Sequence, residues 1–515
     1  MSFEVEAKDL LGRVGRLYTK SGVLETPAIF PVVDPKKQEV SLKTIEKYFK
    51  NIITNSYFIY NIFRKPIDVR KLLGWNGVVM TDSGAYQLMR YGVIEIEPDE
   101  ILRYQFEIGS DIGVMLDLPM DSEESYSSAS IKVEETLRRA LRAVDMRGEL
   151  GDMLLVGPIQ GGIYGDLLVR SARRMSALPF DIYAVGSPTT LLEEYRFDEI
   201  IEMVLKVKLN MRREAPLHLF GAGHPLILPF AVAAGVDLFD SASYVLYARD
   251  DRIMLRDRTV RLDEAKIDYL PCSTKLCEKP VEELREMSKL ERTELIAEHN
   301  LAILREEILE IKQRIHEGTL WEYLEEKARA HRSLYNALRR MGKYLKLLEE
   351  YDPATHPEPS GLLFFGDTSS YRPEPYRHRI RVRYYYKRPD RPVAILLKVD
   401  FKPYNKSWEY IYLNKILGEF RKYIHIYFID DIFGVIPEEV AEVYPLSQHE
   451  SWGASEAPYD DIAHISKVYK YIIAYNYYLS NRNIIITNNI DDIVAILNTI
   501  YSNATPPSWS PQAGA

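Results

Sequence analysis

LHLFGAG (217–223) and VDLFDS (236–241) show the pattern that decides the fold. Each is a short apolar run that ends in a glycine-rich or polar cluster, as expected of a strand buried on both faces. Six further runs repeat the pattern: PAIFPVV (27–33), NIITNSY (51–57), GVVMTDSG (77–84), IGVMLDLP (112–119), MLLVGPIQGG (153–162) and IYAVGS (182–187). Amphipathic, helix-like segments separate most of them.

Eight strand-then-helix units within about 250 residues predict an α/β fold with a (β/α)8 TIM barrel. A doubly wound sheet is the main alternative, but no Gly-x-Gly-x-x-Gly motif follows any of the runs. In a barrel, the polar groups at the C-terminal ends of the strands would point into one shared mouth.

The rest of the chain predicts smaller domains after the barrel. Residues 281–350 have apolar residues at helical spacing, and the Pro-rich segment DPATHPEPSG (352–361) indicates a boundary. Residues 460–503 predict a helix (ISKVYKYIIAYNYYLS, 465–480), a strand (NIIITN, 483–488) and a second helix (DDIVAILNTIY, 491–501). The predicted domains are the barrel with segment 272–299 and the following helices (1–350), a C-terminal α+β domain (351–435), a second small α+β domain (436–503), and a disordered tail or expression remnant (504–515).

Composition narrows the class of protein. The 515 residues are 46% hydrophobic and 27% charged, which excludes a wholly disordered chain, a collagen and a coiled-coil rod. Two cysteines exclude a disulfide scaffold. The net charge of −9 means that any nucleic acid must be met by a local basic patch. The charged N-terminus and the absence of any long apolar run predict no membrane contact and a cytoplasmic location.

Two carboxylates stand at predicted strand ends. Asp82 follows GVVMT and Asp240 follows VDLF, so the barrel would bring both into one pocket. Paired carboxylates break a glycosidic bond with retention when one attacks the anomeric carbon and the other handles the leaving group's proton. The alternative is that each aspartate caps the next helix or turn.

Other strand ends favour a planar polar ligand. Asp117 and Gln160 could meet the donor and acceptor edge of a purine, and Gly186 lets backbone N–H groups approach closely. Tyr86 could stack on such a ring, although a single tyrosine near an apolar helix start is also common in a core.

DSGAYQLMRYG (82–92), PIQGG (158–162), HLFGAGHP (218–225) and GVDLFDSASYVLYARDD (235–251) together resemble the tRNA-guanine transglycosylase family, and the archaeal branch fits best. The resemblance runs from about residue 3 to about residue 450. It implies a pentosyltransferase that exchanges a base in tRNA. Archaeal members replace guanine at position 15 of the D-arm with 7-cyano-7-deazaguanine, a step toward archaeosine, without a nucleotide cofactor.

The resemblance also assigns roles. Asp240 matches the covalent nucleophile and Asp82 the general acid/base. Asp117, Gln160 and Gly186 match residues that read the base, and Tyr86 matches the stacking partner. Ser83, in the same motif as Asp82, is counted with the substrate-binding residues.

The family's zinc motif, C-x-C-x2-C followed by a helical histidine, is altered here. In PCSTKLC, Cys272 and Cys277 align with the first and third cysteines, whereas Thr274 replaces the second. His299 aligns with the histidine. Because structural zinc nearly always has four ligands, three readings stay open: a water or a nearby carboxylate completes the site, zinc binds weakly, or zinc is lost and packing holds the segment.

The strongest basic stretch is YRPEPYRHRIRVRYYYKRPDRP (371–392), whose alternating RIRVRYY predicts a strand with arginines on one face. Eight Lys and Arg against two acidic residues give 8 − 2 = +6. The cations are Arg372, Arg377, Arg379, Arg381, Arg383, Lys387, Arg388 and Arg391. With Tyr384, Tyr385 and Tyr386 they suit contacts with RNA phosphates and bases, although a solvated face is the usual fate of a charge run.

Partners and competing functions follow from the same resemblance. We expect tRNA, guanine and 7-cyano-7-deazaguanine as substrates and a homodimer formed through the helices after Cys272. The glycine-rich pattern of the PUA domain common in archaeal members is not recognisable, which raises the possibility that a separate chain supplies it. A non-catalytic tRNA-binding paralogue and a barrel glycoside hydrolase are the competing functions.

Overall fold

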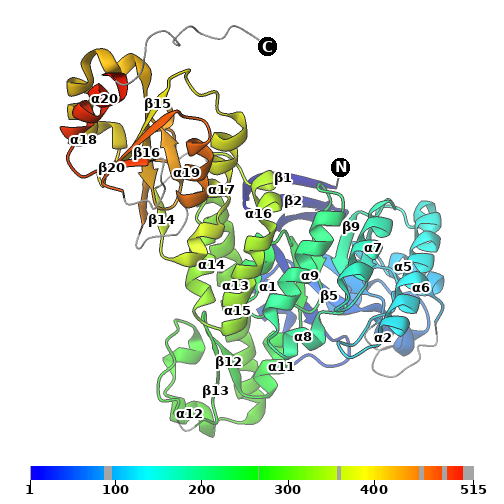
Figure 1. Cartoon of the computed structure of the whole chain (residues 1–515). Coiled ribbons are helices and arrows are strands. Elements are labelled where there is room, and N and C mark those ends of the chain that lie inside the picture. Colours follow the sequence, from blue (N-terminus) through cyan, green and yellow to red (C-terminus); the bar gives the residue numbers. More distant parts are fainter. Residues whose placement is uncertain are drawn as a thin grey trace. The chain divides into compact units, whose positions relative to one another are not determined.

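Eight parallel strands close into a barrel, which confirms the predicted (β/α)8 fold (Figure 1). Each strand lies inside one of the predicted apolar runs. The strands are β4 (Ala28–Val33), β5 (Asn51–Asn55), β6 (Val78–Asp82), β7 (Ile112–Val114), β8 (Leu154–Ile159), β9 (Ile182–Val185), β10 (Leu217–Leu219) and β11 (Leu238–Ser241). Pairing of β11 with β4 closes the ring.

The computed structural model describes residues 2–85, 96–264, 266–355, 361–451, 458–477 and 484–502. They fall into two units, Met1–Pro353 and Ala354–Ala515. The predicted tail, 504–515, lies outside the described residues. No helix among those ranges is both long enough and apolar enough to cross a membrane.

Alternate residues of each strand fill the barrel interior. Val78 and Met80 of β6 and Leu238 of β11 belong to one buried apolar cluster. Because side chains on a strand repeat every two residues, the next inward positions are Asp82 and Asp240. The barrel register therefore aims both carboxylates into the interior at its C-terminal end.

A three-stranded antiparallel sheet closes the opposite end of the barrel. It contains β1 (Phe3–Asp9), β2 (Gly12–Thr19) and β3 (Gly22–Thr26). Phe3, Leu17 and Leu24 of this sheet join the interior cluster. The cavity at the C-terminal ends of the strands is therefore the open end of the barrel.

Helices cover the outside of the barrel (Figure 1). In α6 (Tyr126–Asp145), Ser125 caps the first turn by accepting a hydrogen bond from Ser128 N, and Ala129, Val133 and Leu137 form part of its buried stripe. The other barrel helices are α1 (Leu42–Tyr48), α2 (Ser56–Phe63), α3 (Val69–Leu73), α5 (Pro98–Glu107), α7 (Gly165–Ser176), α8 (Thr189–Glu193), α9 (Phe197–Asn210), α10 (Leu228–Ala233) and α11 (Ser243–Arg249).

A hairpin and a run of helices complete the first unit, in agreement with the helical prediction for residues 281–350. The hairpin pairs β12 (Arg252–Met254) with β13 (Thr259–Arg261). The helices are α12 (Val281–Glu286), α13 (Lys289–Glu317), α14 (Leu320–Ala328), α15 (Arg332–Met341) and α16 (Leu345–Tyr351). Gly318 ends α13 in the left-handed conformation (φ 70°), where glycine is favoured.

The second unit is built on one five-stranded sheet with apolar clusters on both faces. Its order is β17 (Gly434–Pro437), β16 (Ile424–Asp430), β15 (Val393–Lys398), β19 (Tyr471–Tyr475) and β20 (Ile484–Thr487). Helices α18 (Trp408–Leu417) and α20 (Asp492–Ser502) pack on one face, and α19 (Pro458–Ser466) contributes Ile462 and Ile465 to the other. A two-stranded pair, β14 (Leu362–Phe364) with β18 (His449–Ser451), completes the unit.

Three features of this unit differ from the sequence predictions. The predicted boundary between residues 435 and 436 falls inside β17, and one sheet contains strands from both sides of it. The helix predicted across residues 465–480 ends at Ser466, and Tyr471–Tyr475 is strand β19, whereas the strand and helix predicted after it are present. The predicted strand RIRVRYY is instead the end of helix α17 (Pro373–Ile380) followed by a π-helical turn, η5 (Arg381–Tyr385).

Candidate active site

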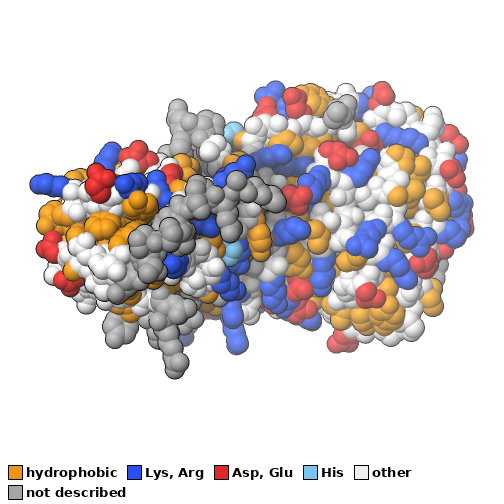
Figure 2. Space-filling model, turned by 45° about the horizontal axis from the view of Figure 1, so that its top comes forward, with side chains coloured by type: hydrophobic (Ala, Val, Ile, Leu, Met, Phe, Trp, Pro, Cys, Tyr) orange, Lys and Arg blue, Asp and Glu red, His pale blue; other side chains and the backbone are white. Residues whose placement is uncertain are grey.

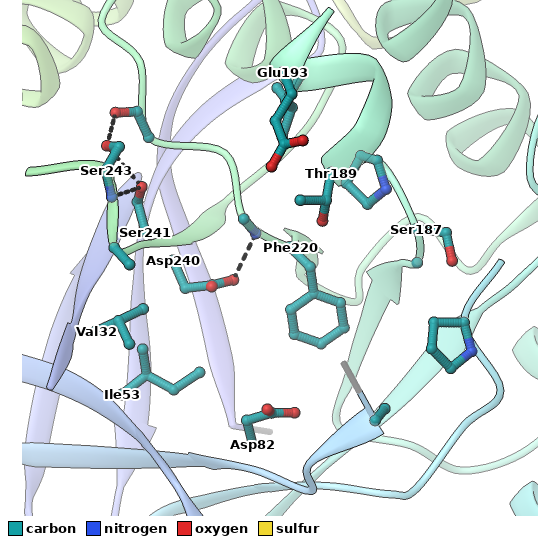
Figure 3. Close-up of a pocket in the computed structure, with 18 of the residues that line it drawn as sticks. Val32, Ile53, Asp82, Ser187, Thr189, Glu193, Phe220, Asp240, Ser241 and Ser243 are labelled. Atoms are coloured by element: carbon teal, nitrogen blue, oxygen red, sulfur yellow. Dashed lines mark hydrogen bonds between the residues drawn. The ribbon is translucent and has the colours of Figure 1, made fainter. Parts of the chain in front are cut away.

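A cavity of about 440 Å³ opens at the C-terminal ends of the barrel strands. Five predicted site residues line it: Asp82, Asp117, Gln160, Gly186 and Asp240. Asp82 and Asp240 lie on different sides of the cavity, and the ring of Phe220 lies beside the space between them (Figure 3). The barrel thus brings together residues up to 158 positions apart (240 − 82) in one site.

Asp82 is a carboxyl that can keep its proton near neutral pH. Burial, followed by the negative charges of Asp117 and Asp240, raises the pKa of Asp82 to about 7. Asn55 Nδ2 donates a hydrogen bond to its Oδ2 at 3.0 Å and fixes the orientation of the group. A carboxyl with these properties can act as a general acid in one step and as a base in the next.

Asp240 is anchored through one of its two oxygens. Oδ1 lies 2.8 Å from His218 Nε2 and accepts a hydrogen bond from Gly221 N at 3.1 Å. Gly221 has φ 68°, a conformation that glycine adopts without strain. The side chain of Asp240 is 13% exposed, so it reaches the cavity while its backbone stays within β11.

A hydrogen-bonded chain of polar side chains forms another wall. Gln160 Nε2 donates to Asp117 Oδ2, Ser187 Oγ donates to Gln160 Oε1 at 2.8 Å, and Met120 N donates to Ser187 Oγ at 2.8 Å. Burial raises the pKa of Asp117, and the hydrogen bond from Gln160 opposes that shift. This wall offers a carboxylate and an amide side by side to a polar ligand.

Position 186 must be glycine because the side chain of Gln160 leaves no space there for a Cβ atom. A Cβ atom at position 186 would lie 2.3 Å from Gln160 Nε2. Any larger residue would therefore displace the amide that holds Asp117.

Two predicted residues do not join the wall. Ser83 is fully buried, does not line the cavity, and its hydroxyl points toward the carbonyl of Met115 at 3.5 Å. Tyr86 lies outside the described residues.

The sequence did not predict several residues of the site, among them Asn55, Ser187 and Phe220, which line the cavity, and His218, which contacts Asp240. The two-residue period of β10 is the signal that could have found two of them, since it turns His218 and Phe220 inward together. The rings of His218 and Phe220 lie 4.7 Å apart. Phe220 gives the cavity a flat apolar face suited to a nucleobase.

Cys272, Cys277 and His299 come together and form a possible metal-binding group. Their ligand atoms lie within 4.8 Å of one another, and among the described residues no Asp or Glu joins the group. His299 Nε2 lies 2.7 Å from the carbonyl of Met254, to which it donates, so Nδ1 is the nitrogen available to a metal. The residues present therefore suit zinc, although they supply three ligands rather than four.

Two further contacts within this group affect metal binding, one made by Thr274 and one between the two cysteines. Thr274 Oγ1 lies 2.7 Å from His299 Nδ1, in the place of the missing cysteine. Cys272 and Cys277 are joined as a disulfide in the structure, with their Cα atoms 5.8 Å apart. Because thiolates are the metal ligands, this disulfide must be reduced before both sulfurs can bind zinc.

Most of the predicted basic stretch stabilises the second unit itself. Arg372 pairs with Glu374, Arg379 donates to the carbonyl of Ile432, and Arg383 pairs with Asp461. Arg391 donates to the carbonyl of Ile424, and Arg377 is buried.

A smaller exposed set remains around η5, which we call the η5 patch. It consists of Arg381, Tyr384, Tyr385, Lys387 and Arg388. The two tyrosines are 68% and 74% exposed. On the face drawn in Figure 2, Lys and Arg side chains lie among Asp and Glu side chains.

Comparison with known proteins identifies the family. Residues 9–333 match the family model described as queuine tRNA-ribosyltransferase. A tRNA-guanine(15) transglycosylase from Pyrobaculum aerophilum is 67% identical over 458 residues, which cover 89% of this chain and 92% of the relative. The protein of the same name from Saccharolobus solfataricus is 43% identical over 87% of this chain and 90% of the relative.

A longer relative carries the same name. The tRNA-guanine(15) transglycosylase from Methanocaldococcus jannaschii is 40% identical over 87% of this chain, which covers 68% of the relative. Family model, relatives and barrel architecture agree with one another. The chain therefore belongs to the tRNA-guanine transglycosylase family of pentosyltransferases and falls among its archaeal members.

Proposed function

We propose that this protein exchanges guanine at position 15 in the D-arm of tRNA for 7-cyano-7-deazaguanine through a covalent Asp240–ribose intermediate. The observation that carries the proposal is the pairing of Asp82, whose pKa lies near 7, with the anchored carboxylate of Asp240 in one cavity. The names of the similar archaeal proteins supply the position in tRNA.

In the first half of the reaction, guanine leaves. The target nucleotide must come out of its stack so that its base enters the barrel mouth. The carboxylate of Asp240 attacks C1′ of the ribose and the bond from C1′ to the base breaks. Asp82 gives its proton to the departing guanine, so no negative charge accumulates on the leaving base.

In the second half, the deazaguanine takes the place of guanine. Asp82, now a carboxylate, accepts the proton from the incoming base. The base attacks C1′ from the face that guanine left, and the bond to Asp240 breaks. Two inversions at C1′ give net retention, and one glycosidic bond replaces another.

The wall formed by Asp117, Gln160 and Ser187 would read the base. Guanine presents N–H donors and a carbonyl acceptor on one edge. The carboxylate of Asp117 can accept from the donors, and the amide of Gln160 is positioned beside it by Ser187. Phe220 would pack against the face of the ring, with Tyr86 as the second stacking partner that the family resemblance implies.

The η5 patch would contact tRNA. Three cations and two exposed tyrosines within eight residues provide phosphate contacts and stacking surfaces together. We place the enzyme in the cytoplasm because its substrate is there. We also propose that the protein forms a homodimer and that a separate chain supplies the PUA domain.

Zinc would be held by Cys272, Cys277 and His299 once the cysteines are reduced. When bound, the ion would cross-link the segment before α12 to helix α13. Because Thr274 supplies no thiolate, zinc would bind more weakly here than at a site with a fourth cysteine.

A non-catalytic tRNA-binding protein is the second candidate, and the altered zinc motif is the observation that favours it. The presence of both Asp82 and Asp240 in one cavity favours the enzyme. Exchange of radiolabelled guanine into a tRNA transcript separates the two, with a transcript that carries adenine at position 15 as the control. Exchange that depends on G15 supports the enzyme, and binding without exchange supports the second candidate.

A further inference from the structure

His218 is the side chain that holds the proposed nucleophile. It lies on β10, next to the strand that carries Asp240, and is fully buried. Its Nε2 and the backbone N–H of Gly221 both meet Oδ1 of Asp240, at 2.8 and 3.1 Å. Across the described ranges of the chain, Oδ2 of Asp240 has no hydrogen-bond partner from the protein.

The surroundings of His218 fix the imidazole as a donor. A carboxylate oxygen only accepts hydrogen bonds, so the proton of this contact resides on Nε2. The rings of Phe30 and Phe220 lie 6.3 and 4.7 Å from the imidazole and restrict its rotation. Nδ1 meets no hydrogen-bonding group among the described residues. The imidazole therefore contacts Asp240 through Nε2 and no hydrogen-bonding group through Nδ1, so it cannot relay a proton to or from Asp240.

We propose that His218 is a positioning residue for Asp240, which together with Gly221 N fixes Oδ1 and leaves Oδ2 as the atom that attacks C1′. This role rests on the proposed assignment of Asp240 as nucleophile. The contribution is geometric, because a carboxylate held in one orientation presents the same oxygen to C1′ in every encounter. Proton transfer stays with Asp82, on the other side of the cavity.

Two neutral amides test the role as a matched pair. The amide nitrogen of His218→Gln reaches about the place of Nε2, so the donor to Asp240 is kept. The side chain of His218→Asn is one methylene shorter. Its amide nitrogen lies at about the place of Nδ1 and cannot reach Asp240. Both variants remove the imidazole and introduce the same polar group, so their cost to folding is similar and is measured by thermal melting.

The expected result is a separation of kcat from KM. His218→Asn should lower kcat for guanine exchange by about 10- to 100-fold, as expected for loss of a hydrogen bond to a charged group. Its KM for tRNA should change by less than about twofold, because His218 is fully buried and does not line the cavity. His218→Gln should recover most of the lost rate.

Three results would overturn the proposal. Wild-type kcat in a folded His218→Asn would show that the contact is dispensable. Equal loss in folded Gln and Asn variants would show that imidazole chemistry, not a donor at that point, matters. A raised KM with unchanged kcat would indicate a binding role. Absence of exchange by the wild-type protein would instead refute the proposed function.

Discussion

Asp82 and Asp240 end strands β6 and β11 and face one cavity, where burial and the charges of Asp117 and Asp240 raise the pKa of Asp82 to about 7. Asp82 can therefore hold its proton near neutral pH, whereas Asp240 is anchored through Oδ1 by His218 and Gly221 N. Two aspartates can therefore perform opposite tasks at the same pH because their surroundings differ.

The raised pKa predicts how stability changes with pH. The carboxyl of Asp82 would lose its proton near pH 3.8 in the unfolded chain and near pH 7 in the folded protein. Between these values the folded state holds the extra proton, so the free energy of unfolding falls as pH rises from about 4 to 7. Asp82→Asn should stabilise the protein at pH 8 by roughly 1–3 kcal/mol, a range reduced for the solvent that reaches the cavity.

Chemical denaturation at pH 4 and pH 8 measures this effect. Most of the gain should vanish at pH 4, which lies close to the unfolded value of 3.8 and well below the folded value of about 7. Asp152→Asn, at an exposed position, is the matched control and should show no such dependence. A stabilisation of Asp82→Asn that is equal at both pH values would contradict the assigned pKa. The same variant should lose exchange activity by at least about 100-fold.

Gly186→Ala tests the wall that reads the base. The new Cβ would lie 2.3 Å from Gln160 Nε2, so the amide must move and its bond to Asp117 breaks. KM for guanine should rise by about 10- to 100-fold. Gly148→Ala, where an added Cβ meets nothing within 4 Å, is the control. Unchanged KM in Gly186→Ala would show that Gln160 does not contact the base.

Thr274→Cys tests the metal-binding group. The substitution supplies the fourth ligand that a structural zinc site needs. After reduction and dialysis against a chelator, elemental analysis should find about one zinc per chain in the variant and less in the wild-type protein. Equal zinc in the two proteins would mean that Thr274 is not at a ligand position. Thiol counting before and after reduction gives the fraction of chains with the disulfide.

Salt dependence tests the η5 patch. Replacing Arg381, Lys387 and Arg388 by Gln should reduce the slope of log Kd against log salt by up to about 2.7, because each phosphate contact contributes about 0.7–0.9. The matched control replaces Lys406, Lys415 and Lys422, which are exposed on the same unit. If both triple variants reduced the slope equally, the η5 patch would contribute no more to tRNA binding than any other exposed cations on this unit.

The barrel and much of its site could be predicted from the sequence. Strands buried on both faces show as short apolar runs, and the turn that follows each run places residues such as Asp82 and Asp240 at the mouth. The antiparallel sheet of β1, β2 and β3 left no comparable signal. Its role is visible only when Phe3 and Leu17 are seen inside the barrel cluster.

The remaining differences have specific physical causes. Tyr471–Tyr475 is a strand within a sheet that is covered on both faces, and a short apolar run of that kind cannot be told from a buried helix by periodicity. The partners of the basic stretch are distant, since Arg383 pairs with Asp461, 78 residues away. The two-residue period of β10 indicates that His218 points inward, but its role beside Asp240 could not be assigned because Asp240 lies on the next strand, whose register the sequence alone does not fix.

Trapping of the covalent intermediate tests the central claim most directly. Wild-type protein is mixed with labelled tRNA, quenched with denaturant and resolved on a denaturing gel, beside Asp240→Asn. A slowly migrating protein–tRNA adduct should form with the wild-type protein and be absent from Asp240→Asn, while filter binding shows that the variant still binds tRNA. An adduct or normal guanine exchange in Asp240→Asn would contradict the assignment of Asp240 as nucleophile.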